Sequence, residues 1–228
     1  MTNDRKWRKK ENMADSHIIL YQGGQGEIVE KKSRFIANIF PVQNEEEALE
    51  EIARMKKKYY DARHNCFAYV IGENNETERC SDDGEPSGTA GRPMLDVLTG
   101  QGIHNAVAIV TRYFGGTLLG TGGLVRAYSG AMKEGLANCV LLKRKAGHKM
   151  SIKTDYNDIG KLQYAARKLE LTELDTIYTD TVTLVLLVPD DMLEKTEKEV
   201  TERTSGRAGI TCGEKLYYGI SGGEIVLL

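Results

Sequence analysis

The sequence contains few cysteines and no long apolar run, and these two features exclude several classes of protein. Its four cysteines lie far apart and form no Cys-x-x-Cys pair or Cys/His cluster, so neither a zinc site nor a disulfide framework is indicated. No apolar run approaches the roughly 18 residues of a membrane helix, and the N-terminus lacks the apolar segment of a signal peptide. We therefore expect a cytoplasmic protein with reduced thiols, no membrane association, no bound metal and no cofactor.

The net charge of −2 is small, but it is unevenly distributed along the chain. Residues 1–43 carry +3 and residues 44–100 carry −6, whereas residues 101–150 carry +6 and residues 151–228 carry −5. A basic block attracts phosphates, so the third of these segments is the one most suited to nucleic acid.

The pattern of apolar residues predicts an α+β protein with two domains. Residues 1–16 are polar and basic without periodicity, which predicts a disordered tail, and a start of translation at Met13 instead of Met1 is a hypothesis. Residues 17–146 read as strands and helices in the order β-β-α-β-α-β-α, with Asn44 as the N-cap of the first helix. Residues 147–228 read as β-α-β-β-α-β, the order of a ferredoxin-like domain.

The stretch "RYFGGTLLGTGGLVRAYSGA" (112–131) places a glycine-rich turn between a predicted strand and a predicted helix. This order aims backbone N–H groups and the positive end of a helix at an anion, and Arg112 and Arg126 can add charged hydrogen bonds. The stretch lacks both the Gly-Lys-Ser/Thr of a Walker A loop and the glycine spacing of dinucleotide-binding folds. A phosphate site and a purely structural turn are equally compatible with it.

The stretch "SDDGEPSGTAGRP" (81–93) crowds three carboxylates, Asp82, Asp83 and Glu85, beside a turn. Such a group can bind Mg²⁺ or supply an acid and a base. Equally, the carboxylates can pair with arginines and fix a long loop. The arginines available are Arg63, Arg79, Arg92 and Arg112.

His64 lies just before a predicted apolar strand, and Cys66 lies near the beginning of that strand. Ser87 has no Gly-x-Ser-x-Gly setting, so a triad of Ser87, His64 and an aspartate has little support. A histidine held by a backbone hydrogen bond and a buried apolar cysteine are the simpler interpretations. A reactive Cys-His pair is the alternative.

Four motifs stand in the order found in the YigZ/IMPACT family, which the chain resembles from Ile18 to Leu136. They are "KKSRFIA", "DARHNCFAYVIG", "SDDGEPSGTAGRPML" and "VTRYFGGTLLGTGGLVRAYSGA". The resemblance implies an N-terminal domain with the fold of the second domain of the S-five type of ribosomal protein. It also implies a C-terminal domain similar to domain V of elongation factor G. Eukaryotic members of the family are translational regulators.

The resemblance also implies a functional surface built from two of these motifs. One part is Asp82, Asp83, Gly84, Glu85 and Pro86; the other is Arg112, Tyr113, Gly115, Gly116, Gly122, Gly123, Arg126 and Tyr128. His64 is a secondary candidate.

We expect this surface to bind RNA or the ribosome and to regulate translation without catalysis. In that hypothesis Tyr113, Phe114 and Tyr128 stack on bases, whereas the alternative places them in the core. An enzyme acting on a phosphorylated small molecule or nucleotide and a protein-interaction module are the other two functions considered. The sequence does not specify the oligomeric state.

Overall fold

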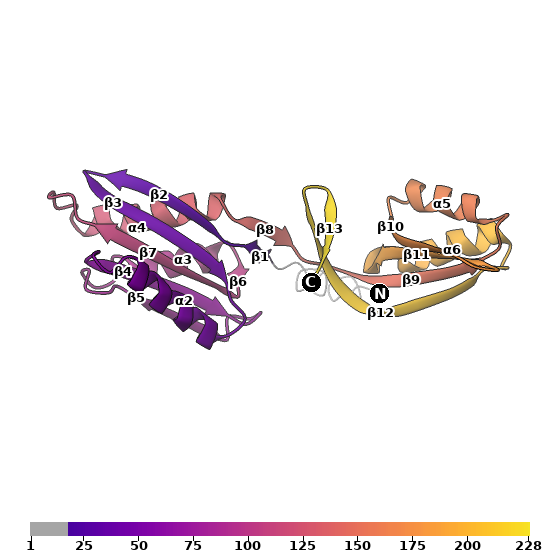
Figure 1. Cartoon of the computed structure of the whole chain (residues 1–228), viewed down its shortest axis with the longest axis horizontal. Coiled ribbons are helices and arrows are strands. Elements are labelled where there is room, and N and C mark those ends of the chain that lie inside the picture. The colour runs from indigo at the N-terminus through magenta and orange to yellow at the C-terminus, as the bar shows by residue number, and fades with distance from the viewer. Residues whose placement is uncertain (1–17) are drawn as a thin grey trace, which may run out of the picture. The chain divides into compact units, whose positions relative to one another are not determined.

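The structure, a computed structural model, describes residues 18–228, which form two compact units. The predicted tail and the alternative start at Met13 lie outside the described residues. The division between the units falls between Lys143 and Arg144, whereas the position expected from the sequence, 146–147, lies within a strand. Both units pack helices on sheets, so the chain has the predicted α+β class (Figure 1). No helix within residues 18–228 is long and apolar enough to cross a membrane.

The N-terminal unit is built on a five-stranded antiparallel sheet with the order β2-β3-β7-β4-β5. Its strands are β2 (Gly24–Glu30), β3 (Ser33–Pro41), β4 (His64–Ile71), β5 (Thr77–Ser81) and β7 (Ala106–Tyr113). Strand β7 is central, and every residue from Ala106 to Arg112 is buried. A strand covered on both faces needs apolar residues at nearly every position, which explains the continuous apolar run of this segment.

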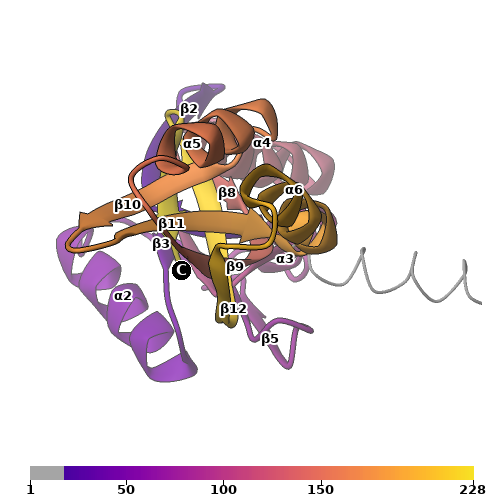
Figure 2. The ribbon, with the colours of Figure 1, turned by 90° about the vertical axis from the view of Figure 1, so that its right-hand side faces the viewer.

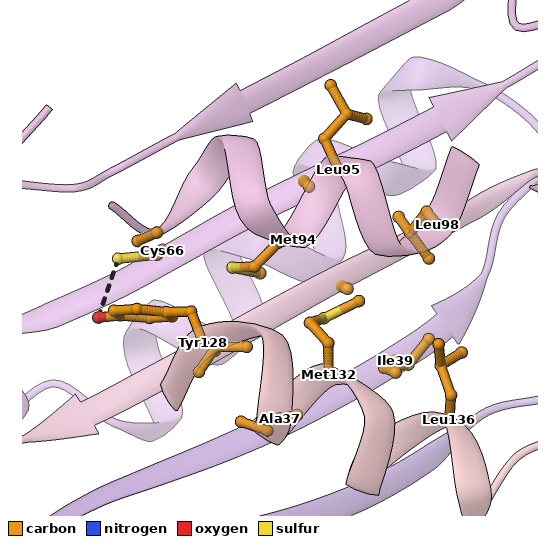
Figure 3. Packing of buried hydrophobic residues seen from close by; sticks show 14 of the residues in the cluster. Ala37, Ile39, Cys66, Met94, Leu95, Leu98, Tyr128, Met132 and Leu136 are labelled. Atoms are coloured by element: carbon orange, nitrogen blue, oxygen red, sulfur yellow. Dashed lines mark hydrogen bonds between the residues drawn. The ribbon is translucent and has the colours of Figure 1, made fainter. Parts of the chain in front are cut away.

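Helices cover both faces of this sheet. Helix α2 (Glu45–Lys58) packs on one face through Ala48, Ile52 and Met55. Helices α3 (Gly91–Gly100) and α4 (Thr121–Ala137) pack on the other. Figure 3 shows side chains of α3 and α4 meeting above the sheet, with Met94 and Leu98 on one helix and Met132 and Leu136 on the other. The larger core therefore lies beneath the two helices that follow the acidic and glycine-rich motifs.

The predicted N-cap of α2 is confirmed. Asn44 Oδ1 accepts a hydrogen bond of 2.9 Å from the backbone N–H of Glu47, and the Glu47 carboxylate accepts from the N–H of Gln43. Glu47 thus binds both the N-cap residue and the residue before it, and three glutamates in the first turn favour the positive end of the helix.

A second, three-stranded sheet of the N-terminal unit has the order β6-β1-β8. Its strands are β1 (Ile18–Gln22), β6 (Ile103–His104) and β8 (Val140–Lys143). It joins the beginning and the end of the unit, because β1 pairs with β8.

The C-terminal unit has a five-stranded sheet with the order β10-β11-β9-β12-β13. Its elements are β9 (Lys145–Thr154), α5 (Ile159–Lys168), β10 (Thr172–Tyr178), β11 (Val182–Pro189), the 3-10 turn η1 (Asp190–Met192), α6 (Leu193–Thr204), β12 (Gly209–Ser221) and β13 (Glu224–Leu227). Up to β12 they follow the predicted order, and α5 and α6 lie side by side (Figure 2). Leu162 and Ala166 of α5 and Val200 of α6 share one core with alternate residues of β9 and β11.

The strands that the sequence pattern missed are short or lie at sheet edges. Strand β2 and strand β5 each pair with one neighbour only, and most of their side chains are exposed or half-buried. Without a buried face, neither strand needs the alternation of apolar and polar residues by which a strand is recognised. Strand β5 therefore leaves no signal in the sequence pattern, and it ends at Ser81, where the acidic stretch 81–93 begins.

Candidate functional site

The acidic and glycine-rich motifs are joined by a buried polar network. Arg112 Nη1 donates to Glu85 Oε1 at 2.6 Å, and the two side chains are 6% and 3% exposed. The hydroxyl of Tyr128 donates to the same Oε1 at 2.9 Å, and Cys66 Sγ donates to the Tyr128 oxygen at 3.3 Å. One carboxylate thus connects the end of β7, the middle of α4 and the loop before α3.

The side chain of Arg112 is held from several directions. Its guanidinium lies over the rings of Phe35 and Phe114, with distances to the ring centroids of 5.3 and 5.5 Å. Nη2 contacts Ser33 Oγ at 3.4 Å, and the same oxygen accepts from the backbone N–H of Gly115. Nε is buried and has no acceptor within residues 18–228.

Asp82 fixes the loop that leads into α3. Its carboxylate accepts three backbone hydrogen bonds of 2.8 to 2.9 Å, from the N–H groups of Gly88, Ala90 and Gly91. Burial raises the pKa of Asp82, but these three hydrogen bonds outweigh burial, so its pKa lies below the usual value. Asp82 therefore replaces the side-chain cap that α3 lacks.

Asp83 binds a different set of partners. Its carboxylate accepts from Lys56 Nζ at 2.8 Å and from the backbone N–H of Asn65 at 2.7 Å. Burial raises its pKa, and the hydrogen bonds from Lys56 and Asn65 lower it further than burial raises it. Its backbone carbonyl bonds to His64 Nδ1 at 2.9 Å. A carbonyl oxygen only accepts, so Nδ1 carries the hydrogen and, in the neutral ring, Nε2 is the acceptor.

The three carboxylates therefore do not gather around one point. No group of three or more His, Cys, Asp or Glu side chains suited to a metal ion occurs within residues 18–228. Of the four arginines considered as partners, Arg112 is the one that pairs with this acidic stretch in the described chain. The alternative in which ion pairs and hydrogen bonds fix the loop is the one that the structure supports.

The glycines of the turn have separate roles. Gly115 crosses the β2–β3 turn so closely that a Cβ there would lie 2.0 Å from the backbone carbon of Lys32. Gly120 has a φ of +71°, which residues with a Cβ rarely adopt, and it is the N-cap residue of α4. The chain therefore needs glycine at both positions for its turn, whatever the turn binds.

The N-terminus of α4 lacks the features that stabilise the start of α2. It has no side-chain cap and no acidic residue in its first turn. The guanidinium of Arg126 lies near this end, since a Cβ at Gly122 would be 3.7 Å from Arg126 Nη1. Arg126 is exposed and makes no ion pair or hydrogen bond within residues 18–228. A cation and free N–H groups at the positive end of a helix dipole are an environment that favours an anion.

A cleft of about 380 Å³ opens beside this helix end. It is lined by Arg63, His64, Glu85, Pro86, Arg112, Phe114, Leu118, Leu119, Gly120, Thr121 and Leu124. The two motifs therefore meet at an open cleft, with the Glu85–Arg112 pair in its wall. Phe114 and Leu118 are 48% and 83% exposed, which gives the cleft an apolar side next to its cationic one.

The structure places the other predicted residues outside this cleft. Tyr128 is fully buried, so it belongs to the core and cannot stack on a base. The hydroxyl of Tyr113 donates to Asp61 at 2.8 Å. Gly84 lies beside His64, and Gly116 lies in the exposed turn before Gly120. Gly123 begins α4 next to Leu119.

The basic block expected from the sequence is divided between the two units. Lys143 ends the N-terminal unit, and Arg144, Lys145 and Lys149 belong to the C-terminal unit. Arg63, in contrast, lines the cleft, is exposed and has no partner within residues 18–228. It comes from "KKKYYDARH", a basic stretch hidden by the negative sum of residues 44–100. A shorter charge window would have found it.

Comparisons with known proteins cover most of the chain. Residues 31–136 match the Impact N-terminal domain, and residues 152–207 match a domain of unknown function, DUF1949. IMPACT family member YvyE of Bacillus subtilis is 40% identical over 205 residues, which are 90% of this chain and 94% of that protein. IMPACT family member YigZ of Escherichia coli is 34% identical, over 70% of this chain and 79% of that protein.

Other matches extend the comparison to eukaryotes and to solved structures. Protein IMPACT of Mus musculus is 34% identical over 98 residues, which are 41% of this chain and 30% of that protein. A crystal structure of a hypothetical protein is 29% identical and has a TM-score of 0.55, with 88% of this chain and 98% of that chain covered.

Proposed function

Because the chain belongs to the IMPACT family and its cleft gathers donors suited to an anion, we propose that the protein binds RNA, free or within the ribosome. In this proposal it regulates translation in the cytoplasm and catalyses no reaction. The proposal includes the fold of the second domain of the S-five type of ribosomal protein for the N-terminal unit. For the C-terminal unit it includes a ferredoxin-like fold similar to domain V of elongation factor G.

The observation that carries the proposal is the uncapped N-terminus of α4 beside the cleft. In α2, glutamates occupy the first turn, whereas α4 has no acidic residue there and Arg126 lies over its first turn. The positive end of the helix dipole repels the charge of Arg126. A phosphate bound to the N–H groups would carry a negative charge that attracts both Arg126 and the helix N-terminus. Arg63, which lines the cleft, supplies a further cation.

The apolar side of the cleft supports RNA rather than a bare anion as the ligand. Phe114 offers an exposed ring and Leu118 an exposed aliphatic side chain, and base stacking on such surfaces adds affinity without requiring a particular sequence. A volume of about 380 Å³ lies within the range of small-ligand sites, and it suits one nucleotide of a single strand better than a duplex.

Fluorescence anisotropy with a labelled 12-residue single-stranded RNA tests the proposal at 50 and 200 mM salt. We expect binding that weakens as salt rises, because cations of the protein replace counterions of the phosphates. Arg63→Ala and Arg126→Ala should each weaken binding several-fold and reduce the salt dependence. Arg92→Ala is the matched control, since Arg92 is exposed and already paired with Asp96.

Two results would overturn the proposal. One is the absence of RNA binding at 50 mM salt. The other is binding that Arg63→Ala, Arg126→Ala and Arg92→Ala leave equally unchanged, which would place any RNA contact elsewhere on the protein.

A further inference from the structure

The Glu85 carboxylate has one oxygen that the protein leaves without a donor. Oε1 accepts from both Arg112 and Tyr128, whereas Oε2 takes part in no hydrogen bond within residues 18–228. The side chain is only 3% exposed, and Glu85 lines the cleft. Unlike the buried Arg112 Nε, Oε2 is not cut off from solvent, so this unpaired acceptor is open to a donor from a molecule bound in the cleft.

The chemistry of Oε2 limits what that donor can be. A phosphate oxygen is only an acceptor, so the group that meets Oε2 must carry an O–H or N–H. Arg112 Nη1 lies 2.6 Å from Oε1 of the same carboxylate. The positive charge of Arg112 therefore weakens the repulsion between Glu85 and a phosphate bound nearby. One cleft can therefore hold a phosphate at the N-terminus of α4 and a neutral donor at Glu85.

In a nucleotide the donor that does not depend on the base is the ribose 2′-hydroxyl. Amino groups of bases also donate, but their positions differ between bases, whereas every RNA nucleotide carries the same 2′-hydroxyl and DNA carries none. We infer that Glu85 is a specificity-determining residue whose Oε2 accepts a hydrogen bond from a ribose 2′-hydroxyl, so that the cleft selects RNA over DNA. The inference rests on the proposed function, since it assumes a nucleotide in the cleft.

The test compares the wild-type protein with three 12-residue oligonucleotides of one sequence: RNA, DNA and 2′-fluoro RNA. The 2′-fluoro group keeps an RNA-like sugar but has no hydrogen to donate. Because a hydrogen bond to a charged group is worth more than a neutral one, we expect DNA and 2′-fluoro RNA to bind roughly tenfold more weakly than RNA.

A variant locates the effect. Glu85→Gln retains an oxygen for Arg112 and replaces Oε2 by an amide NH₂, which cannot accept a hydrogen bond. We expect this variant to bind the three oligonucleotides with similar affinity, whereas Glu78→Gln, on edge strand β5, keeps the wild-type preference. If Glu85→Gln does not fold, equal binding of the three oligonucleotides by the wild type still overturns the inference.

The possible failures can be told apart. Equal binding of all three oligonucleotides by the wild type, or 2′-fluoro RNA that binds as well as RNA, overturns the role of Glu85 and leaves phosphate binding intact. A Glu85→Gln variant that folds and keeps the wild-type ratio also overturns it. Absence of binding to any oligonucleotide overturns the proposed function as well.

Discussion

Arg112 and Glu85, 27 residues apart in the sequence, form an ion pair of 2.6 Å between two side chains that are almost completely buried. The pair fixes the acidic loop to the end of β7, next to the point where the chain turns through Gly115. The loop is held there, and the cleft beside it stays open, with the exposed side chains of Phe114 and Leu118 in its lining. The same pair therefore belongs to the scaffold and to the wall of the cleft.

Replacement of Arg112 should show how much the N-terminal unit depends on this pair. Arg112→Leu leaves the Glu85 carboxylate buried without a cation, and such a change costs about 3 to 5 kcal/mol. Urea unfolding followed by circular dichroism measures the loss of unfolding free energy. Arg92→Ala, which breaks an exposed pair, should cost at most about 1 kcal/mol. A loss for Arg112→Leu no larger than that of the control would contradict a structural role for the pair.

Substitutions at two glycines test whether glycine is required where another segment of backbone comes close. Gly115→Ala places a Cβ 2.0 Å from the backbone of Lys32, so the β2–β3 turn must shift, and we expect a clear fall in melting temperature. Gly100→Ala meets no atom within 4 Å and lies at the end of α3, so it should leave the melting temperature unchanged or slightly higher. Differential scanning fluorimetry of both variants checks the contrast; equal melting temperatures would contradict it.

The sequence predicted elements whose apolar face is buried. Strand β7 and helices α2 and α4 have such faces, and they lie where the sequence predicted them: α2 after Asn44, and β7 and α4 on either side of the glycine-rich turn. The edge strands β2 and β5 were missed because an edge strand with exposed side chains leaves no periodic signal. The α+β class and the element order of the C-terminal unit depend on buried faces, so they could be predicted.

The candidate site was predicted as two motifs but not as an arrangement. Asp82 accepts from backbone N–H groups, whereas Glu85 pairs with Arg112. Either role requires only an acidic residue in a loop, so the spacing of residues along the chain does not show which residue has which role. Tyr128 was ambiguous for a similar reason, since an aromatic residue on a helix can face either solvent or core. Contacts between distant segments decide such roles, and one sequence does not contain them.

Cys66 should react slowly with alkylating reagents. Burial raises the pKa of its thiol to about 12, so almost no thiolate exists near neutral pH, and the side chain is fully buried. Iodoacetamide at pH 8, followed by peptide mass spectrometry, should label the exposed Cys80 and Cys212 while native Cys66 stays unlabelled. Urea should make Cys66 as reactive as the others. Rapid labelling of Cys66 in the folded protein would contradict its buried position and revive a reactive Cys-His pair.

Acid should unfold the N-terminal unit because Asp82 and Asp83 must be protonated on the way. Their pKa values lie below the ordinary value in the folded state, so their contribution is complete above about pH 5, where the unfolded carboxyls are also ionised. The contribution is lost as the pH falls from there through the folded-state pKa values. Asp82→Asn keeps one oxygen for the N–H groups of Ala90 and Gly91, but it removes the negative charge and the acceptor of the Gly88 N–H, so it should lower the unfolding free energy by roughly 1 to 2 kcal/mol at pH 7. The same variant should lose less stability than the wild type between pH 5 and pH 2, whereas Ser87→Ala, an exposed change in the same loop, should follow the wild type. Urea unfolding at a series of pH values measures both effects, and a wild-type stability that does not fall with acid would show that these carboxylates gain nothing on folding.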